Sequence, residues 1–275
     1  MNSNNIFTLQ TKLVTVARAL GQRQLLLLAL LILALAPNSL AQGASDYHRV
    51  EVFGGYSLAR GTSNVEQLSA TSPGGVETFS NLCSSSTGER LGTNSQKFFC
   101  ERRNYHGFDA SVTFNLTRYF GLKADITGHY KSESFADVFP TPFGDATQTI
   151  DTRERVHQFL FGVQVKDNGV ERRLKPFGHA LVGAARYNNR QRQEIDLFPD
   201  FNFLVEDRET SLAMKLGGGL DVRVSRRIDL RVFEIDYNPI YAGDRTYKTI
   251  SGPFTLDAMG KTAHNYTFSF GIVIH

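Results

Sequence analysis

Apolar residues recur at every second position of this chain, in stretches of about ten residues that begin near residue 50. In residues 107–116, Phe, Ala, Val, Phe and Leu take the even positions, and Asp, Ser, Thr and Asn lie between them. Successive side chains of a β-strand point to opposite faces of its sheet, so this period predicts strands with one apolar and one polar face. A surface helix would instead show a period of 3.6 residues. The sequence is therefore predicted to be all-β.

The alternation predicts eight strands. Their residues are 50–58, 107–116, 120–130, 156–165, 176–187, 212–224, 228–241 and 266–274. In the seventh strand the apolar parity changes at Val232, which predicts a β-bulge there. The fifth strand is apolar on both faces, and we expect Phe177, Leu181 and Tyr187 to point outward.

The connections between these strands alternate in length. Long connections, with residues 59–105 the longest, fall at one end of an up-and-down array, and short ones fall at the other. Transmembrane barrels of the outer-membrane type have this asymmetry of short turns and long external loops. A soluble lipocalin-like carrier also has eight alternating strands. The fold class predicted is an eight-stranded antiparallel up-and-down transmembrane β-barrel spanning residues 42–275, and the soluble barrel stays open as the alternative.

The first 41 residues are predicted to be a secretory signal peptide. Lys12, Arg18 and Arg23 precede twelve apolar residues at 25–36 and a small-residue end at 39–41. Twelve residues rise only about 18 Å as a helix, against a hydrocarbon core of about 30 Å. Removing this leader leaves 27 basic and 27 acidic residues. We expect no nucleic-acid partner, because such a surface requires an excess of basic residues.

The polar face of the predicted strands gathers ionisable residues of both signs, six acidic and, with Arg49 included, five basic. We expect them to lie in the barrel lumen as paired charges that fill it, because buried charge is tolerated only with a partner. These residues are Glu51, Asp109, Lys123, Asp125, Lys215, Asp221, Arg223, Arg231, Glu234 and Asp236. A narrow, porin-like channel for small solutes is the alternative use of the same residues.

Aromatic residues fall near the ends of the apolar faces, where membrane barrels place their interfacial girdles. The chain has no Trp, so Tyr and Phe must supply such a girdle. The expected girdle consists of Tyr56, Phe120, Tyr130, Tyr187, Tyr237, Tyr241 and Tyr266.

Residues 230–237, 265–273 and the hairpin 108–130 resemble strands of the OmpA-like outer-membrane β-barrel proteins. The resemblance implies the outer membrane of a Gram-negative-type bacterium, contact with outer-membrane lipid and lipopolysaccharide, and insertion by the barrel-assembly machinery. That machinery recognises the final strand, and the corresponding signal here is Tyr266, Phe268, Phe270 and His275. We expect a monomer, with a surface ligand bound through the external loops.

Cys83 and Cys100 are the only cysteines, and in an exported chain we expect them to form a disulfide that closes the largest loop. No cofactor, metal or catalytic residues are expected. The seven histidines are dispersed, and His129 shares a face with Asp125 but has no Ser or Cys nucleophile beside it. The predicted role is non-enzymatic, in envelope structure or surface interaction.

Overall fold

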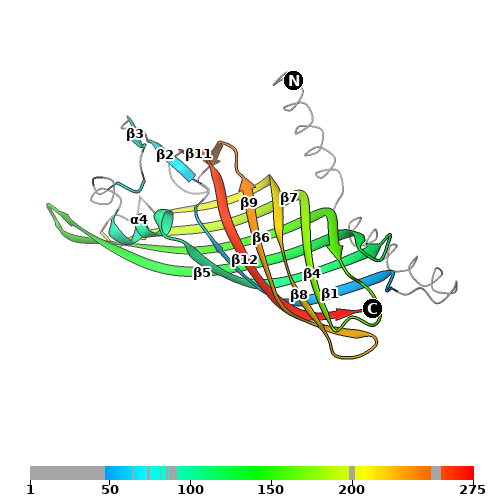
Figure 1. The fold of residues 1–275 in the computed structure, drawn as a ribbon. Helices are drawn as coiled ribbons and strands as arrows, with labels where there is room; N and C mark the ends of the chain where they lie inside the picture. The colour runs from blue at the N-terminus through cyan, green and yellow to red at the C-terminus, as the bar shows by residue number, and fades with distance from the viewer. Residues whose placement is uncertain are drawn as a thin grey trace, which may run out of the picture. The chain divides into compact units, whose positions relative to one another are not determined.

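In the computed structural model the eight predicted strands close into an antiparallel barrel (Figure 1). The structure describes residues 47–63, 65–72, 75–80, 82–84, 86, 92–197, 202–248 and 255–275. The strand order around the barrel is β1-β12-β9-β8-β7-β6-β5-β4, so consecutive barrel strands are neighbours and the topology is up-and-down. The predicted signal peptide, residues 1–41, lies outside the described residues.

The barrel strands differ greatly in length. They are β1 (Val50–Gly61), β4 (Arg103–Asn115), β5 (Phe120–Thr141), β6 (Gly144–Lys166), β7 (Leu174–Ile195), β8 (Phe203–Arg223), β9 (Ile228–Tyr241) and β12 (Thr262–Ile274). The ladder between β1 and β12, with Tyr56 opposite Phe270, closes the barrel. A closed barrel pairs the backbone groups that an open sheet would leave at its edges.

Tight turns join the strands at one end of the barrel, which we call the short-turn end. Backbone hydrogen bonds from Thr117 to Phe120 and from Ser225 to Ile228 close two of these turns. The other end, the extended end, differs from the prediction, because residues 131–155 and 188–209 are mostly strand and not loop. The β5 and β6 hairpin runs beyond the other strands (Figure 1). These extensions are paired through the backbone ladder and lack the apolar alternation from which a strand is predicted.

The remaining connections at the extended end also fold. A four-stranded sheet has the order β10-β11-β2-β3, formed by β2 (Val65–Ser72), β3 (Gly75–Phe79), β10 (Arg245–Lys248) and β11 (Thr255–Gly260). Helix α4 (Thr93–Cys100) lies between β3 and β4 in the chain. Among the described residues, no helix is long and apolar enough to cross a membrane.

Two contacts fix α4 in place. The carboxylate of Asp137 on β5 accepts hydrogen bonds at 2.9 Å from the backbone N–H groups of Asn94 and Ser95, which caps the start of the helix from outside its own segment. At the other end, Cys100 forms the predicted disulfide with Cys83, with Cα atoms 5.6 Å apart. Both ends of the helix are therefore held against neighbouring segments.

The predicted bulge is present, and the predicted facing of β7 is wrong. Leu220 pairs with Phe233 and Asp221 pairs with Arg231, so Val232 is the extra residue. Phe177 and Leu181 are 7% and 3% exposed and point into the barrel. Gly178, Ala180, Val182 and Ala184 lie on the outer face instead, and the large side chains of this part of β7 fill the interior.

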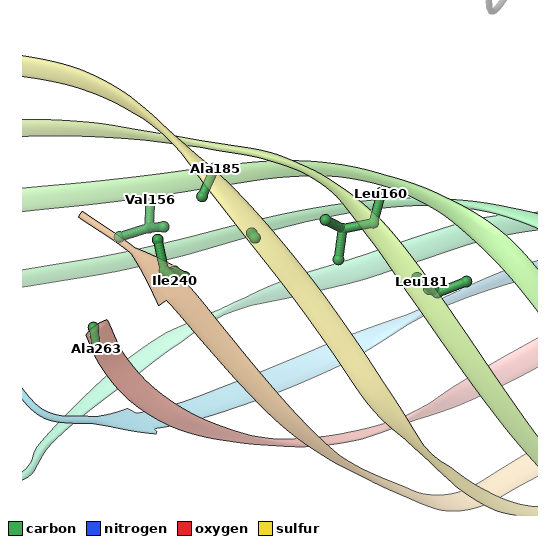
Figure 2. Packing of buried hydrophobic residues seen from close by; sticks show 7 residues of the cluster. Val156, Leu160, Leu181, Ala185, Ile240 and Ala263 are labelled. Atoms are coloured by element: carbon green, nitrogen blue, oxygen red, sulfur yellow. The ribbon is translucent and has the colours of Figure 1, made fainter. Parts of the chain in front are cut away.

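An apolar layer lies inside the barrel towards the extended end. It draws buried side chains from five strands (Figure 2), namely Val156, Leu160, Leu181, Ala185, Ala213, Ile240 and Ala263. Tyr187 packs against this layer. The prediction that Tyr187 belongs to an outward girdle is therefore wrong, because it lies on the same inward-facing side of β7 as Phe177 and Leu181.

Candidate functional site

An apolar belt covers the outside of the barrel, and each of the eight strands contributes to it. One exposed member from each strand, between 39% and 61% exposed, identifies the belt: Val52, Phe114, Ile126, Phe161, Val182, Leu216, Ile235 and Phe270. The charged residues lie on the opposite, inner face. This is the reverse of a water-soluble barrel, which keeps its apolar residues inside, and a contiguous apolar surface of this extent requires a non-aqueous surrounding. The barrel therefore has the surface of a membrane-spanning protein.

Tyrosines border the belt towards the extended end, and three of them bind histidines on neighbouring strands. The hydroxyl oxygens of Tyr56, Tyr130 and Tyr237 lie within hydrogen-bond distance of ring nitrogens of His106, His157 and His264, at 2.5, 3.0 and 2.6 Å. Amphipathic rings of this kind favour the membrane–water interface.

The other predicted girdle residues divide between the two borders of the belt. Tyr241 and Tyr266 lie outward near the extended end, and Phe120 lies outward beside a tight turn at the short-turn end. The histidine partners were not predicted. The sequence does indicate their position: each histidine stands two residues before the apolar run of its strand, and therefore on the same outward face.

The interior nearest the short-turn end holds a group of ion pairs. Lys166 Nζ lies 3.0 Å from a carboxylate oxygen of Glu51 and 2.7 Å from one of Asp221. Lys175 and His275 both reach Asp229 at 2.8 Å. Of these six residues, only Glu51 and Asp221 were predicted to be lumen charges. Lys166 and Lys175 were missed because the predicted strands ended one residue short of them.

Arg231 forms the next layer of the interior, further from the short-turn end. Its guanidinium lies 2.8 Å from Asp221 and 2.5 Å from Glu234. Phe53 and Phe177 cover its two faces, with the guanidinium carbon 4.1 and 4.2 Å from the ring centroids. The aromatic rings exclude water on both sides, and the carboxylates supply the charge that such a buried cation requires.

The centre of the barrel carries two fully buried lysines. Lys215 Nζ lies 3.1 Å from Asp109, 2.9 Å from Asp125 and 3.9 Å from Asp236. Lys123 Nζ lies 3.6 Å from Asp125 and 3.4 Å from Glu234. Each lysine thus bridges carboxylates from different strands, which cross-links the barrel wall.

Nine of the ten predicted lumen charges lie in this interior at 0% to 2% exposure. Arg223 lies at the short-turn rim, where its side chain is 16% exposed and 3.9 Å from Asp229. A water-filled pore would leave the lining side chains exposed to solvent. The observed burial describes a closed interior instead.

Two groups in the described part of the chain have the composition of a metal site. His179, Glu234 and Asp236 place ligand atoms within 4.8 Å of one another, and so do Asp109, Asp125 and Glu234. In both groups a lysine ammonium already lies beside the carboxylates, with Lys123 3.4 Å from Glu234 and Lys215 between Asp109 and Asp125. The arrangement therefore fits ion pairs and not a bound cation.

A serine and a histidine also meet in the interior. Ser57 Oγ lies 3.0 Å from His129 Nε2, a distance that suits a nucleophile and its base. Both residues lie opposite Gly107, Ser57 from β1 and His129 from β5, so a search along single strands cannot find the pair. Ser57 is 0% and His129 2% exposed, so the pair is closed off from solvent. Asp125, which shares a face with His129, binds Lys215 instead.

The extended end forms a structured platform of paired strands, the second sheet and α4. Glu154 binds Arg103 at 2.8 Å and accepts a hydrogen bond from Tyr105 at 2.9 Å, while Arg103 lies 4.0 Å above the ring of Phe98 from α4. At the tip of the β5 and β6 hairpin, Phe143 is 81% exposed. This tip is an apolar projection at the extended end.

No family model matches the sequence, and no curated protein matches it either. Among solved structures, the chain is similar to Ail of Yersinia pestis, solved in complex with the heparin analogue sucrose octasulfate (11% identity, 82% of this chain and 100% of that chain, TM-score 0.35). It is also similar to the outer membrane protein OprG of Pseudomonas aeruginosa (8% identity, 84% and 98%, TM-score 0.44). A third similar structure is the outer membrane protease OmpT of Escherichia coli (9% identity, 85% and 99%, TM-score 0.48).

Proposed function

We propose that this protein is a non-enzymatic barrel of a bacterial outer membrane, in which a closed barrel anchors a surface platform at the extended end. One observation carries the proposal: a continuous apolar belt on all eight strands encloses an interior of paired, buried charges. The belt fits a lipid bilayer, and the filled interior leaves room for neither a solute nor a substrate.

The platform is the part of this protein that we propose makes contacts outside the membrane. Strands β5 to β8 continue well past the apolar belt, and α4 and the second sheet are attached to them. Arg245 of β10 reaches Asp207 of β8 at 3.3 Å, which joins the second sheet to the barrel. The exposed Phe143 supplies an apolar contact point for a surface ligand.

The C-terminal strand supports insertion of the chain as a single barrel. Tyr266, Phe268 and Phe270 point outward and are 38%, 44% and 56% exposed, as an assembly factor that recognises the strand would require. His275 has a different place, because its ring lies inside the short-turn end at 2.8 Å from Asp229. The chain closes its own barrel, so we propose a monomer.

Gel mobility and membrane extraction test this proposal together. A closed barrel that stays folded in cold SDS should migrate differently before and after boiling. The protein should also remain in the outer-membrane fraction after extraction with urea. Recovery of the protein in the periplasmic wash, with no heat-dependent shift, would contradict the membrane barrel and support the soluble carrier.

Planar-bilayer recordings separate the closed anchor from the small-solute channel. The refolded protein should show no steady conductance, because Lys123 and Lys215 occupy the centre of the barrel at 0% exposure. A reproducible single-channel current from the wild-type protein would contradict the closed interior and favour the channel.

A further inference from the structure

The outward face of β6 and β7 changes from apolar to cationic within one step of their register. Phe159 lies opposite Ala184 inside the apolar belt. The next outward pair towards the extended end is His157 and Arg186. Beyond it, β6, β7 and β8 carry further arginines on the same outward face. Together with Arg186 they form an arginine ladder of Arg153, Arg155, Arg186, Arg190, Arg192 and Arg208, all exposed.

The register of the strands brings like charges together on this face. Arg153 lies directly opposite Arg190, and Asn188 lies between Arg155 and Arg208 on its two neighbouring strands. Like charges opposite each other destabilise a sheet. This cost is relieved when an anion binds between the guanidinium groups.

The acidic residues of this face neutralise only part of the ladder. Arg190 lies 3.6 Å from Glu206, and Arg192 pairs with Glu194. Asp151 on β6 lies opposite Arg192 and is the third acidic residue beside the six arginines. Within the parts of the chain that the structure describes, the remaining members of the ladder form no ion pair. These members are Arg153, Arg155, Arg186 and Arg208. The face therefore keeps an excess of positive charge next to the apolar belt.

A hollow of about 470 Å³ opens on the same face. Arg153, Arg190 and Arg192 line it, together with the hydroxyl groups of Ser132, Ser134 and Thr152 and the carboxylates of Glu133 and Asp151. Guanidinium groups bind phosphate through paired N–H donors, and serine hydroxyls add further donors. The hollow has the donors and the size for a phosphorylated sugar.

The height of the ladder distinguishes between classes of anionic lipid. Arg186 and Arg192 are six residues apart on β7, which is about 20 Å along a strand and about 15 Å along the membrane normal at a strand tilt of about 40°. The headgroup layer of a phospholipid leaflet is about 5–8 Å thick. The ladder is thus taller than a phospholipid headgroup. At its base, the hydrogen-bonded Tyr130 and His157 mark the interface.

We infer that the arginine ladder binds a phosphorylated glycolipid of the surrounding leaflet, whose phosphate groups are distributed over several sugar units above its acyl chains. This inference rests on the proposed function for the orientation of the extended end towards the cell exterior. The apolar belt holds the acyl chains, the lower arginines bind the phosphates nearest them, and the hollow receives the outer sugar phosphates.

The test measures binding of fluorescently labelled rough-type lipopolysaccharide to the refolded protein in zwitterionic detergent micelles. The triple variant R155Q/R186Q/R208Q should weaken binding about tenfold or more, since each change removes a charge-assisted contact. The matched control is R226Q/R227Q, which removes exposed arginines from a turn at the short-turn end and should change the affinity less than about twofold. Wild-type protein should bind dephosphorylated lipopolysaccharide as weakly as the triple variant binds the intact lipid.

Three results would overturn the inference. The first is equal binding by the wild-type protein and the triple variant. The second is equal competition by phosphatidylglycerol micelles, which would assign the ladder to any anionic headgroup. The third is equal competition by inorganic phosphate at millimolar concentration, which would reduce it to a general anion patch. Each variant is also checked for its heat-dependent gel shift, so loss of the barrel is distinguished from loss of the lipid site.

Discussion

Replacing Lys215 by methionine tests whether the paired charges hold the barrel interior together. Lys215 lies within 3.1 Å of both Asp109 and Asp125 and is 0% exposed. Methionine preserves most of the side-chain volume but leaves two buried carboxylates without their shared cation. Removal of one partner from a buried ion pair costs about 3–5 kcal/mol. At a slope of about 2 kcal/mol per molar, the urea midpoint should fall by about 2 M.

The assay is a urea titration of the refolded protein, with the folded fraction measured from the unboiled band on SDS gels, because the chain has no Trp for fluorescence. Lys131→Met is the matched control. Lys131 binds Glu133 at 2.6 Å, but the two side chains are 18% and 34% exposed, so its loss should cost only about 0–1 kcal/mol. Adding Asp125→Asn to Lys215→Met should recover part of the loss. If Lys215→Met unfolds at the same urea concentration as Lys131→Met, the ion pairs do not stabilise the interior.

Three further predictions concern the belt, the disulfide and the short-turn end. Leu216→Arg should destabilise the barrel in lipid vesicles by about 2–4 kcal/mol, because it puts a charge in the apolar belt. Thr210→Arg, at the level of the arginine ladder, should cost only about 0–1 kcal/mol. Similar costs for both variants would show that the membrane does not lie at the apolar belt. Cys100→Ser should raise the rate of proteolysis in residues 82–100, since the disulfide constrains only the platform. The urea midpoint of the barrel should stay unchanged. A lower midpoint would show that the platform and the barrel unfold together. Burial, with the positive charges of His275 and Lys175, lowers the pKa of His48 from 6.5 to about 4. Between those pH values the unfolded chain binds a proton that the folded chain does not, so stability should fall as the pH drops from 6.5 to 4, and urea titrations of His48→Phe should show a smaller fall.

The closed barrel is predictable from the sequence because most of its strands show, in their own alternation of apolar and polar residues, which side faces lipid. The alternation in residues 107–116 and 266–274 depends only on neighbours along the chain, and the parity change at Val232 locates the bulge in the same way. Both features are local consequences of strand geometry. The facing of β7 was not predictable, since Gly, Ala and Val occupy both of its faces and packing against other strands decides which side is buried.

The two ends of the barrel were predictable to different degrees. The short-turn end follows from connections of a few residues, which leave little choice of path. The structure of the extended end does not follow from the sequence, because its long strands are held by cross-strand hydrogen bonds and carry polar residues on both faces. A loop and such a strand have similar compositions, so only the partner strand distinguishes them.

The sequence by itself determined the fold class, the apolar outer face, the charged inner face and the pairing of the two cysteines. Only the tertiary structure decided which charges meet, since Lys215 and Asp109 are joined through the lumen and are 106 positions apart in the chain. The same holds for the Ser57 and His129 contact and for the arginine ladder, which exist because register places residues of different strands side by side. The face on which a residue lies depends on its position in one strand. The register depends on two strands together, so the sequence of a single strand does not determine the register.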